Sequence, residues 1–305
     1  MGRVRSARSA GCGSATFPEA GADAIRDERR MPMHPTAVID SQAEIDPSAE
    51  IGPYVVISGP VRVAAGAVVG PHAHLLGRTT IGPGCRLHTG VIVGDLPQDR
   101  AYKGSPTECH IGAETILREY VTVHRGTAEG TSTIVGERCF VMAHAHIGHN
   151  CCVGDDVMLV NGSLLGGYVV VGCRAVISGN AAVHQFVRVG ELAMIAGLAK
   201  IVQDVPPFMM VDGPGWCVGV NVIGMRRAGM DPAERREVKA MYRRLYCVPT
   251  SLNAAIEEFT STVQTEAGRR ILHFLQNPSR RGIGAHGGPR SRNADNAEDD
   301  GAAGE

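Results

Sequence analysis

The stretch from Val135 to Ile177 reads VGERCF-VMAHAH-IGHNCC-VGDDVM-LVNGSL-LGGYVV-VGCRAV-I, with an aliphatic residue at the start of every group of six. An α-helix repeats every 3.6 residues and an ordinary strand every two, so neither element produces this period. A short strand and a turn in every six residues do produce it, which is typical of a hexapeptide β-helix. The stretch therefore predicts a prism of short parallel strands.

The same phase extends in both directions from this stretch. Steps of six from Ile39 to Ile201 give 28 positions, of which 25 are Ile, Leu or Val. The exceptions are Asp99, Ser105 and Glu129. Three groups of six make one triangular coil, so the series predicts about nine coils. We expect a left-handed parallel β-helix, with the handedness taken from the fold class.

The exceptions mark two breaks in the repeat, at about 94–110 and 124–134, which we interpret as loops extruded from the prism. Irregular loops on a rigid scaffold often carry binding and catalytic residues. Imidazole is the natural general base near neutral pH, so a group of histidines beside such loops favours a site. Five histidines lie in or near the middle coils: His124, His144, His146, His149 and His184.

Outside the repeat, the chain has a different residue pattern. Asp231 followed by Pro232 predicts the start of a helix, and apolar residues then recur at helical spacing over 233–246 and 251–275. We therefore expect four segments: a disordered extension at 1–32, the β-helix at 33–205, a small α-helical C-terminal domain at 206–278, and a disordered tail at 279–305.

Composition narrows the function classes. Lys and Arg total 30 and Asp and Glu total 31, so nothing in the charge favours a nucleic-acid partner. No apolar run approaches the ~20 residues of a membrane span, so no integral membrane contact is expected. The nine cysteines form no Cys-x-x-Cys pair, and residues 1–32 hold no apolar signal region. Both observations favour free thiols and a cytoplasmic protein.

Several motifs, in this order and at this spacing, resemble the bacterial UDP-N-acetylglucosamine O-acyltransferases, which begin lipid A synthesis. The resemblance covers about 34–284 and is carried by these runs: Gly94–Asp99 (GDLPQD), Val121–Thr127 (VTVHRGT), Ala145–Cys151 (AHIGHNC), Ala182–Phe186 (AVHQF), Gln203–Pro207 (QDVPP) and Gly219–Asn221 (GVN).

The resemblance implies a homotrimer without a cofactor or metal, with its sites between subunits. It implies transfer of a 3-hydroxyacyl chain from acyl carrier protein to the glucosamine 3-hydroxyl of UDP-N-acetylglucosamine. His149 would be the general base, and the backbone N–H of Gly167 would hold the oxyanion. The implied substrate-binding residues are Asp99, His124, His146, His184 and Gln185 for the sugar and phosphates, Asn221 and Arg227 for the nucleotide, and Gly197 for acyl length.

Four positions depart from the family's pattern. Asn150 stands where the family commonly has Asp, Ala101 where it often has Lys, Tyr168 where it has His, and Ile223 where it has Glu. An amide can orient an imidazole but cannot stabilise imidazolium by charge, so a weaker base is expected. The changes also leave open a different acceptor, such as a 3-amino sugar nucleotide.

Three other readings stay open at this point. One is a relative of the same fold that binds a nucleotide sugar or carrier protein without turnover. Another is a β-helix zinc hydratase of the carbonic-anhydrase type, with His124, His144 and His149 around the ion. The third is the sister N-acyltransferase of the same pathway, which carries a separate N-terminal domain that residues 1–32 are too few to form. Lys200 is interpreted as a solvated surface residue.

Overall fold

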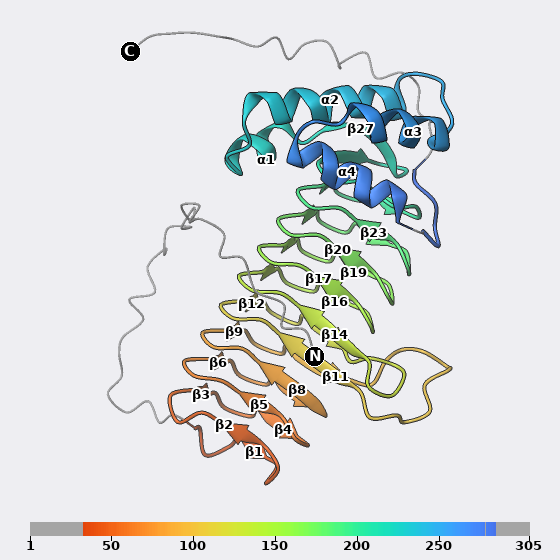
Figure 1. Ribbon diagram of the computed structural model, residues 1–305. Helices are drawn as coiled ribbons and strands as arrows, with labels where there is room; N and C mark the ends of the chain where they lie inside the picture. The colour runs from red at the N-terminus through yellow and green to blue at the C-terminus, as the bar shows by residue number, and fades with distance from the viewer. Residues whose placement is uncertain (1–32, 278, 285–305) are drawn as a thin grey trace, which may run out of the picture.

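A computed structural model of the chain describes residues 33–277 and 279–284. The extension expected at 1–32 lies outside the described residues, as does the part of the expected tail at 285–305. The described chain winds into a left-handed parallel β-helix with helices packed on its C-terminal end (Figure 1). The predicted fold class is confirmed.

The prism has three sheets, and each complete coil takes one short strand from each of them. The nine-stranded sheet comprises β1 (Val38–Ile39), β4 (Val56–Ser58), β7 (His74–Leu76), β10 (Ile92–Asp95), β13 (Thr122–His124), β16 (His146–Ile147), β19 (Leu164–Leu165), β22 (Ala182–Val183) and β25 (Lys200–Ile201). The eight-stranded sheet comprises β2 (Glu44–Ile45), β5 (Arg62–Val63), β8 (Arg78–Ile81), β11 (Glu108–Ile111), β14 (Ser132–Val135), β17 (Cys152–Val153), β20 (Val170–Val171) and β23 (Arg188–Val189). The ten-stranded sheet comprises β3 (Glu50–Ile51), β6 (Val68–Val69), β9 (Arg86–Leu87), β12 (Ile116–Leu117), β15 (Phe140–Val141), β18 (Met158–Leu159), β21 (Val176–Ile177), β24 (Met194–Ile195), β26 (Met209–Asp212) and β27 (Trp216–Val220).

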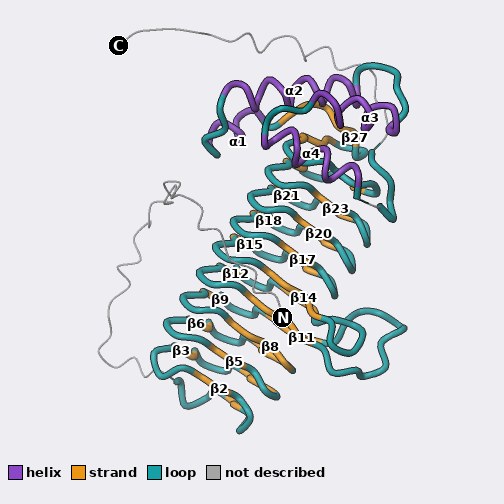
Figure 2. The backbone as a smooth tube through the Cα atoms, viewed as in Figure 1, coloured by secondary structure: helices purple, strands orange, loops and turns teal. Residues whose placement is uncertain are grey.

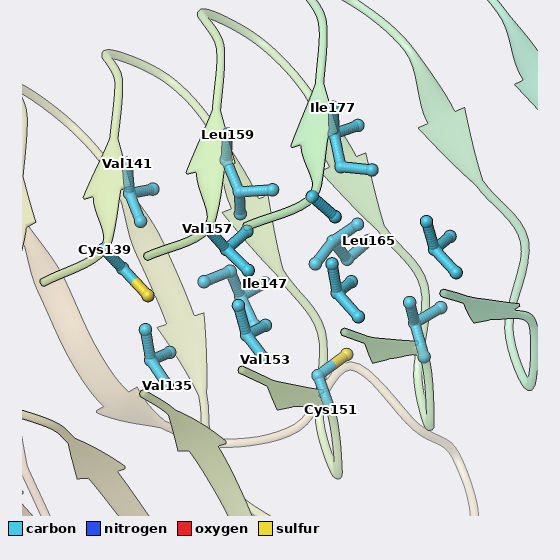
Figure 3. Packing of buried hydrophobic residues seen from close by; sticks show 14 of the residues in the cluster. Val135, Cys139, Val141, Ile147, Cys151, Val153, Val157, Leu159, Leu165 and Ile177 are labelled. Atoms are coloured by element: carbon cyan, nitrogen blue, oxygen red, sulfur yellow. The ribbon is translucent and has the colours of Figure 1, made fainter. Parts of the chain in front are cut away.

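The core is a set of stacked rows inside the prism. Val141, Leu159 and Ile177, from the neighbouring strands β15, β18 and β21, lie side by side in one row and are buried (Figure 3). Cys139 and Val157, two residues before the first two of these, form a parallel row of smaller side chains. Each coil therefore buries the aliphatic residue that the period of six predicts, and stacking buries it against the next coil.

Both predicted loops leave the prism at the same corner, between the nine-stranded and eight-stranded sheets (Figure 2). The first connects β10 to β11 and the second connects β13 to β14. Strand pairing continues across them, since Ile92 pairs with Thr122 and Glu108 pairs with Ser132. The loops are thus insertions that leave the register of the prism intact.

The C-terminal part differs from expectation in its boundaries. β26 pairs in parallel with β24, so the prism continues beyond the expected limit at residue 205. In the described part of the chain, four helices follow: α1 (Val222–Arg227), α2 (Pro232–Tyr246), α3 (Leu252–Thr262) and α4 (Glu266–Gln276). Asp231 caps α2 in a reciprocal box with Glu234, as its position before Pro232 predicts. The range 251–275 is two helices, because Thr265 caps a new one.

Residues 279–284 are a second correction, since the sequence assigned them to a disordered tail. Ile283 forms a parallel bridge with Asp204, and the Arg281 Nε donates to the Val202 carbonyl at 3.0 Å. This segment therefore lies along the last coil. Among the described helices, none combines the length and apolar character needed to cross a bilayer.

Candidate active site

A groove of about 610 Å³ follows the outer face of the nine-stranded sheet and the turns after β16, β19, β22 and β25. Leu164 and Ala182 give it an apolar floor, and Gln98 and Lys200 lie on its borders. Six of the residues predicted for the site line this groove: His124, His146, His149, Gly167, His184 and Gln185.

His149 lies in the turn after β16, with a side chain only 10% exposed. Its Nδ1 is 3.0 Å from Oδ1 of Asn150, within hydrogen-bond distance. Its Nε2 lies 4.0 Å from Oδ2 of Asp99, which is too far for a hydrogen bond. With Asn150 Oδ1 as acceptor, Nδ1 carries the proton and Nε2 keeps its lone pair. That lone pair can accept a proton from a substrate hydroxyl in the groove.

Gly167 occupies the next turn, directly beside the His149 ring. A Cβ on Gly167 would lie 2.4 Å from Cε1 and 2.5 Å from Nε2 of His149, so only glycine leaves room for this imidazole. In the described part of the chain, the Gly167 N–H donates to no partner. A base and a free amide donor therefore stand side by side, an arrangement that suits acyl transfer through a tetrahedral oxyanion.

His124 and His146 form the inner wall, with their rings edge to face and centroids 4.8 Å apart. Burial, together with the nearby His124 and His149, lowers the pKa of His146 to about 4. Burial also lowers the pKa of His124, although Asp95 acts in the opposite direction. Both rings are therefore neutral near pH 7, which lets them form hydrogen bonds to a sugar or phosphate without adding charge.

Each of these two rings keeps hydrogen-bonding capacity for a ligand. The His146 Nδ1 is 2.8 Å from the Thr122 hydroxyl, which leaves Nε2 for the groove. The His124 Nδ1 is buried and has no partner among the described residues. A buried polar atom without a partner is unfavourable unless a ligand or water satisfies it.

The first loop brings Asp99 to this site. Its Oδ1 accepts from the Ala101 N–H at 2.9 Å, which closes a tight turn. The Tyr102 hydroxyl donates to the Ser105 carbonyl at 2.9 Å, and the Arg125 guanidinium from the second loop lies 3.3 Å from the Tyr102 oxygen. The two loops therefore support each other, and together they place Asp99 opposite His149.

Three predicted residues lie elsewhere in the described structure and do not line the groove. Gly197 is in the turn before β25, on the opposite edge of the nine-stranded sheet from His149. Asn221 caps α1, since its Oδ1 accepts from the Gly224 N–H at 2.9 Å, and its Nδ2 donates to the Leu192 carbonyl at 2.9 Å. Arg227 is exposed in α1. Any contact that these residues make with substrate lies outside this groove.

Sequence reasoning missed two parts of the site. Lys200, interpreted as a solvated surface residue, borders the groove because β25 directs it outward next to Ala182. Thr127 donates to Asn150 Oδ1 at 2.9 Å from the second loop. The outward position of Lys200 could have been read from the period of six, but nothing in the sequence fixes the path of the loop that carries Thr127.

The zinc-hydratase alternative needs three histidines around one ion. His144 instead stacks on Tyr120, with ring centroids 5.3 Å apart, at the corner before the nine-stranded sheet. Within residues 33–277 and 279–284, no three His, Cys, Asp or Glu side chains gather in a way that could hold a metal ion.

Comparison with known families gives two matches. Residues 204–284 match the family described as UDP-N-acetylglucosamine O-acyltransferase, domain 2. Residues 132–167 match the bacterial transferase hexapeptide repeat. The two matches cover the helical C-terminal part and the middle coils, which carry His149 and Gly167.

Curated relatives and solved structures agree with these matches. The acyl-[acyl-carrier-protein]–UDP-N-acetylglucosamine O-acyltransferase of Saccharophagus degradans is 42% identical over 82% of this chain and 98% of its own. The enzyme of that name from Thermodesulfovibrio yellowstonii is 38% identical over 82% and 98%. The Francisella novicida UDP-N-acetylglucosamine acyltransferase structure has a TM-score of 0.81 at 34% identity, covering 83% of this chain and 94% of that one. A Moraxella catarrhalis structure gives 0.80 at 33% identity, covering 83% and 99%.

Proposed function

Because the chain belongs to the UDP-N-acetylglucosamine O-acyltransferase family, we propose that it acylates the glucosamine 3-hydroxyl of UDP-N-acetylglucosamine with His149 as general base. The chain is an acyltransferase, and its donor is an acyl-acyl carrier protein. A 3-hydroxyacyl chain as the group transferred, and a place at the start of lipid A synthesis, belong to the same proposal. The observation that carries the proposal is the free Nε2 of His149 beside the free N–H of Gly167.

The reaction can be followed at named atoms. Nε2 of His149 takes the proton from the sugar hydroxyl while the hydroxyl oxygen attacks the thioester carbon. The carbonyl oxygen becomes an oxyanion, which accepts a hydrogen bond from the Gly167 N–H. The intermediate then collapses, the C–S bond breaks, and the carrier thiolate leaves with the proton held by His149. No cofactor enters this sequence of steps.

The remaining groove residues bind the substrates in this proposal. His124 and His146 are neutral near pH 7 and donate to, or accept from, sugar hydroxyls, together with Asp99 and Gln185. Lys200 supplies a positive charge at the far end of the groove, beyond the apolar floor of Leu164 and Ala182.

We propose that the nucleotide reaches residues outside this groove. Arg227 is the exposed cation there, and Asn221 fixes the start of the helix that carries it. The acyl chain passes Gly197, where the absence of a side chain leaves room for a long chain. Because Arg227, Asn221 and Gly197 do not line the groove of one chain, they complete the site from a neighbouring subunit.

The trimer belongs to the same proposal. Ile134, Cys152 and Val170 pair in register across β14, β17 and β20 and point outward. Ile134 and Val170 are each 42% exposed, so they form an apolar row on the surface of one chain. We expect this row to be buried against a neighbouring subunit, which Val170→Glu should prevent. Sedimentation of the unchanged protein and of Val170→Glu measures the oligomeric state, and we expect the variant to be a monomer.

The activity is tested by mass spectrometry. The protein is incubated with UDP-N-acetylglucosamine and a series of 3-hydroxyacyl carrier proteins, and the acylated nucleotide sugar is sought. Product from the unchanged protein and none from His149→Ala would support the proposal, and the product mass gives the chain length. Absence of product with every donor would contradict it. A parallel reaction with the 3-amino sugar nucleotide tests the altered acceptor that Ala101 and Ile223 suggest.

A further inference from the structure

Four side chains from two turns and the second loop are joined by hydrogen bonds, and the base His149 is one of them. The Tyr168 hydroxyl is 2.8 Å from the Thr127 hydroxyl. The Thr127 hydroxyl donates to Asn150 Oδ1 at 2.9 Å, and that oxygen also lies 3.0 Å from the His149 Nδ1. We call this series, Tyr168–Thr127–Asn150–His149, the hydroxyl relay.

We propose that Thr127 and Tyr168 are positioning residues, which act through Asn150 to keep the His149 Nε2 unprotonated and facing the groove. This inference rests on the proposed role of His149 as general base. It gives a function to two residues that no part of the reaction touches. It also explains how the chain works with an amide where a carboxylate would hold the imidazole by charge.

The direction of these hydrogen bonds decides which ring nitrogen of His149 carries the proton. A carboxylate offers only acceptors to a neighbouring imidazole, but an amide can turn either its oxygen or its NH₂ toward the ring. The NH₂ would favour the opposite tautomer, with the proton on Nε2 of His149. The Thr127 hydroxyl has one proton and donates it to Asn150 Oδ1, so the hydrogen bond between the two hydroxyls runs from Tyr168 to Thr127. Asn150 must then present its oxygen, which fixes the proton on Nδ1.

The hydroxyl relay is needed because the Asp99 carboxylate favours the opposite tautomer of His149. The Asp99 carboxylate lies 4.0 Å from Nε2 of His149, and its negative charge favours a proton on that nitrogen. At that separation it makes no hydrogen bond, whereas Asn150 does, at 3.0 Å. The relay therefore opposes Asp99 and keeps the lone pair available in the free enzyme.

The surroundings of Tyr168 hold its hydroxyl in place. Its ring stands edge-on to His149 with centroids 5.3 Å apart and at 90°. Its other side stacks on Phe186, with centroids 4.9 Å apart and 22° between the planes. Tyr168 has a backbone φ of 59°, and Tyr120, at 58°, lies in an equivalent turn and stacks on His144. Tyr120 is therefore a matched control outside the groove.

The test combines kinetics with the tautomer of His149 in the free protein. Histidine-selective ¹⁵N NMR distinguishes protonated from unprotonated ring nitrogens, and His149→Gln assigns the signals. Tyr168→Phe and Thr127→Val should shift the His149 proton toward Nε2 and lower kcat about tenfold, with KM nearly unchanged. Thr127→Ser, which keeps the hydroxyl, should restore both. Tyr120→Phe should change neither.

The Asn150→Asp variant shows whether Tyr168 acts through Asn150 or by a direct contact with substrate. Asn150→Asp cannot present an NH₂, so adding Tyr168→Phe to it should cause no further loss of kcat. An unchanged His149 tautomer in Tyr168→Phe and Thr127→Val would overturn the relay. The relay would also be overturned if Tyr168→Phe lowered kcat equally in the unchanged protein and in the Asn150→Asp variant. The NMR measurement needs no substrate, so it stands or fails separately from the acyltransferase assay.

Discussion

The imidazole of His149 lies against the backbone of Gly167 so closely that a Cβ at Gly167 would come within 2.4 Å of its Cε1. Side-chain carbons essentially never approach other atoms below 3.0 Å. The base and the oxyanion donor are therefore in direct contact, and a side chain cannot be added at Gly167 without displacing the His149 ring.

Gly167→Ala should lower kcat at least about a hundredfold, because the added methyl displaces the His149 ring from its place beside the free N–H. Gly167 does not have a left-handed φ, so the backbone tolerates alanine and the fold should survive. Steady-state kinetics and thermal unfolding measure the two effects. Gly179→Ala is the folding control, since that Cβ meets nothing closer than 3.4 Å in the same position of another turn. Activity close to that of the unchanged enzyme would contradict the contact.

The stability of the protein should fall as the pH drops from about 6.5 to about 4. Burial lowers the pKa of His146 in the folded chain to about 4, below its ordinary value of 6.5. The unfolded chain thus binds a proton in that window while the folded chain does not, so acid favours unfolding. The contribution is complete above pH 6.5 and is lost as the pH approaches 4. Unfolding midpoints across this range should decline less steeply in His146→Gln; an identical slope would refute this account.

Arg188→Ala should destabilise the protein by about 3 kcal/mol, because it removes the cation that pairs with the buried Asp204 carboxylate and leaves only the hydrogen bond from the backbone N–H of residue 188. The Asp204 side chain is 0% exposed, and its Oδ2 lies 2.7 Å from the Arg188 Nε. The matched control is Arg62→Ala, which breaks a pair with Glu44 whose side chains are 67% and 69% exposed. That change should cost less than about 1 kcal/mol. Urea unfolding measures both, and equal effects would show that the buried pair is not special.

Gly197→Met should shorten the acyl chain that the enzyme prefers. A Cβ at Gly197 meets only the Gly179 carbonyl, at 3.4 Å, so the fold should accommodate a longer side chain. The added methionine would then occupy space that the end of the acyl chain needs. Competition between carrier proteins with different chain lengths, read by product mass, measures the preference. An unchanged product distribution would remove Gly197 from this role.

The fold could be predicted because each residue of the aliphatic series has one environment. Ile57, Leu117 and Ile195 are far apart in the chain, yet each points into the prism with at most 1% of its surface exposed. A period of six cannot show where the prism ends. β26 continues it beyond Pro207 because Met210 and Val211 pair with β24, although the series has stopped.

The site could be predicted only in part. His146, His149 and Gly167 lie on strands and turns, so the repeat places them on one face. Asp99 and Thr127 lie on loops, whose paths depend on hydrogen bonds that no pattern reveals. Tyr168 was recognised as a departure from the family's pattern, but its hydroxyl meets Thr127 across 41 residues of sequence. The role of Tyr168 depends on that contact, which the sequence does not show.

The most direct test of the central claim is the transfer rate of His149→Ala, measured with UDP-N-acetylglucosamine and the preferred acyl carrier protein under single-turnover conditions. The oligomeric state and unfolding midpoint are recorded on the same sample. The account predicts a loss of at least about a thousandfold with assembly and stability unchanged, because the general base is gone while the groove remains. A rate within about tenfold of the unchanged enzyme would show that another group takes the proton.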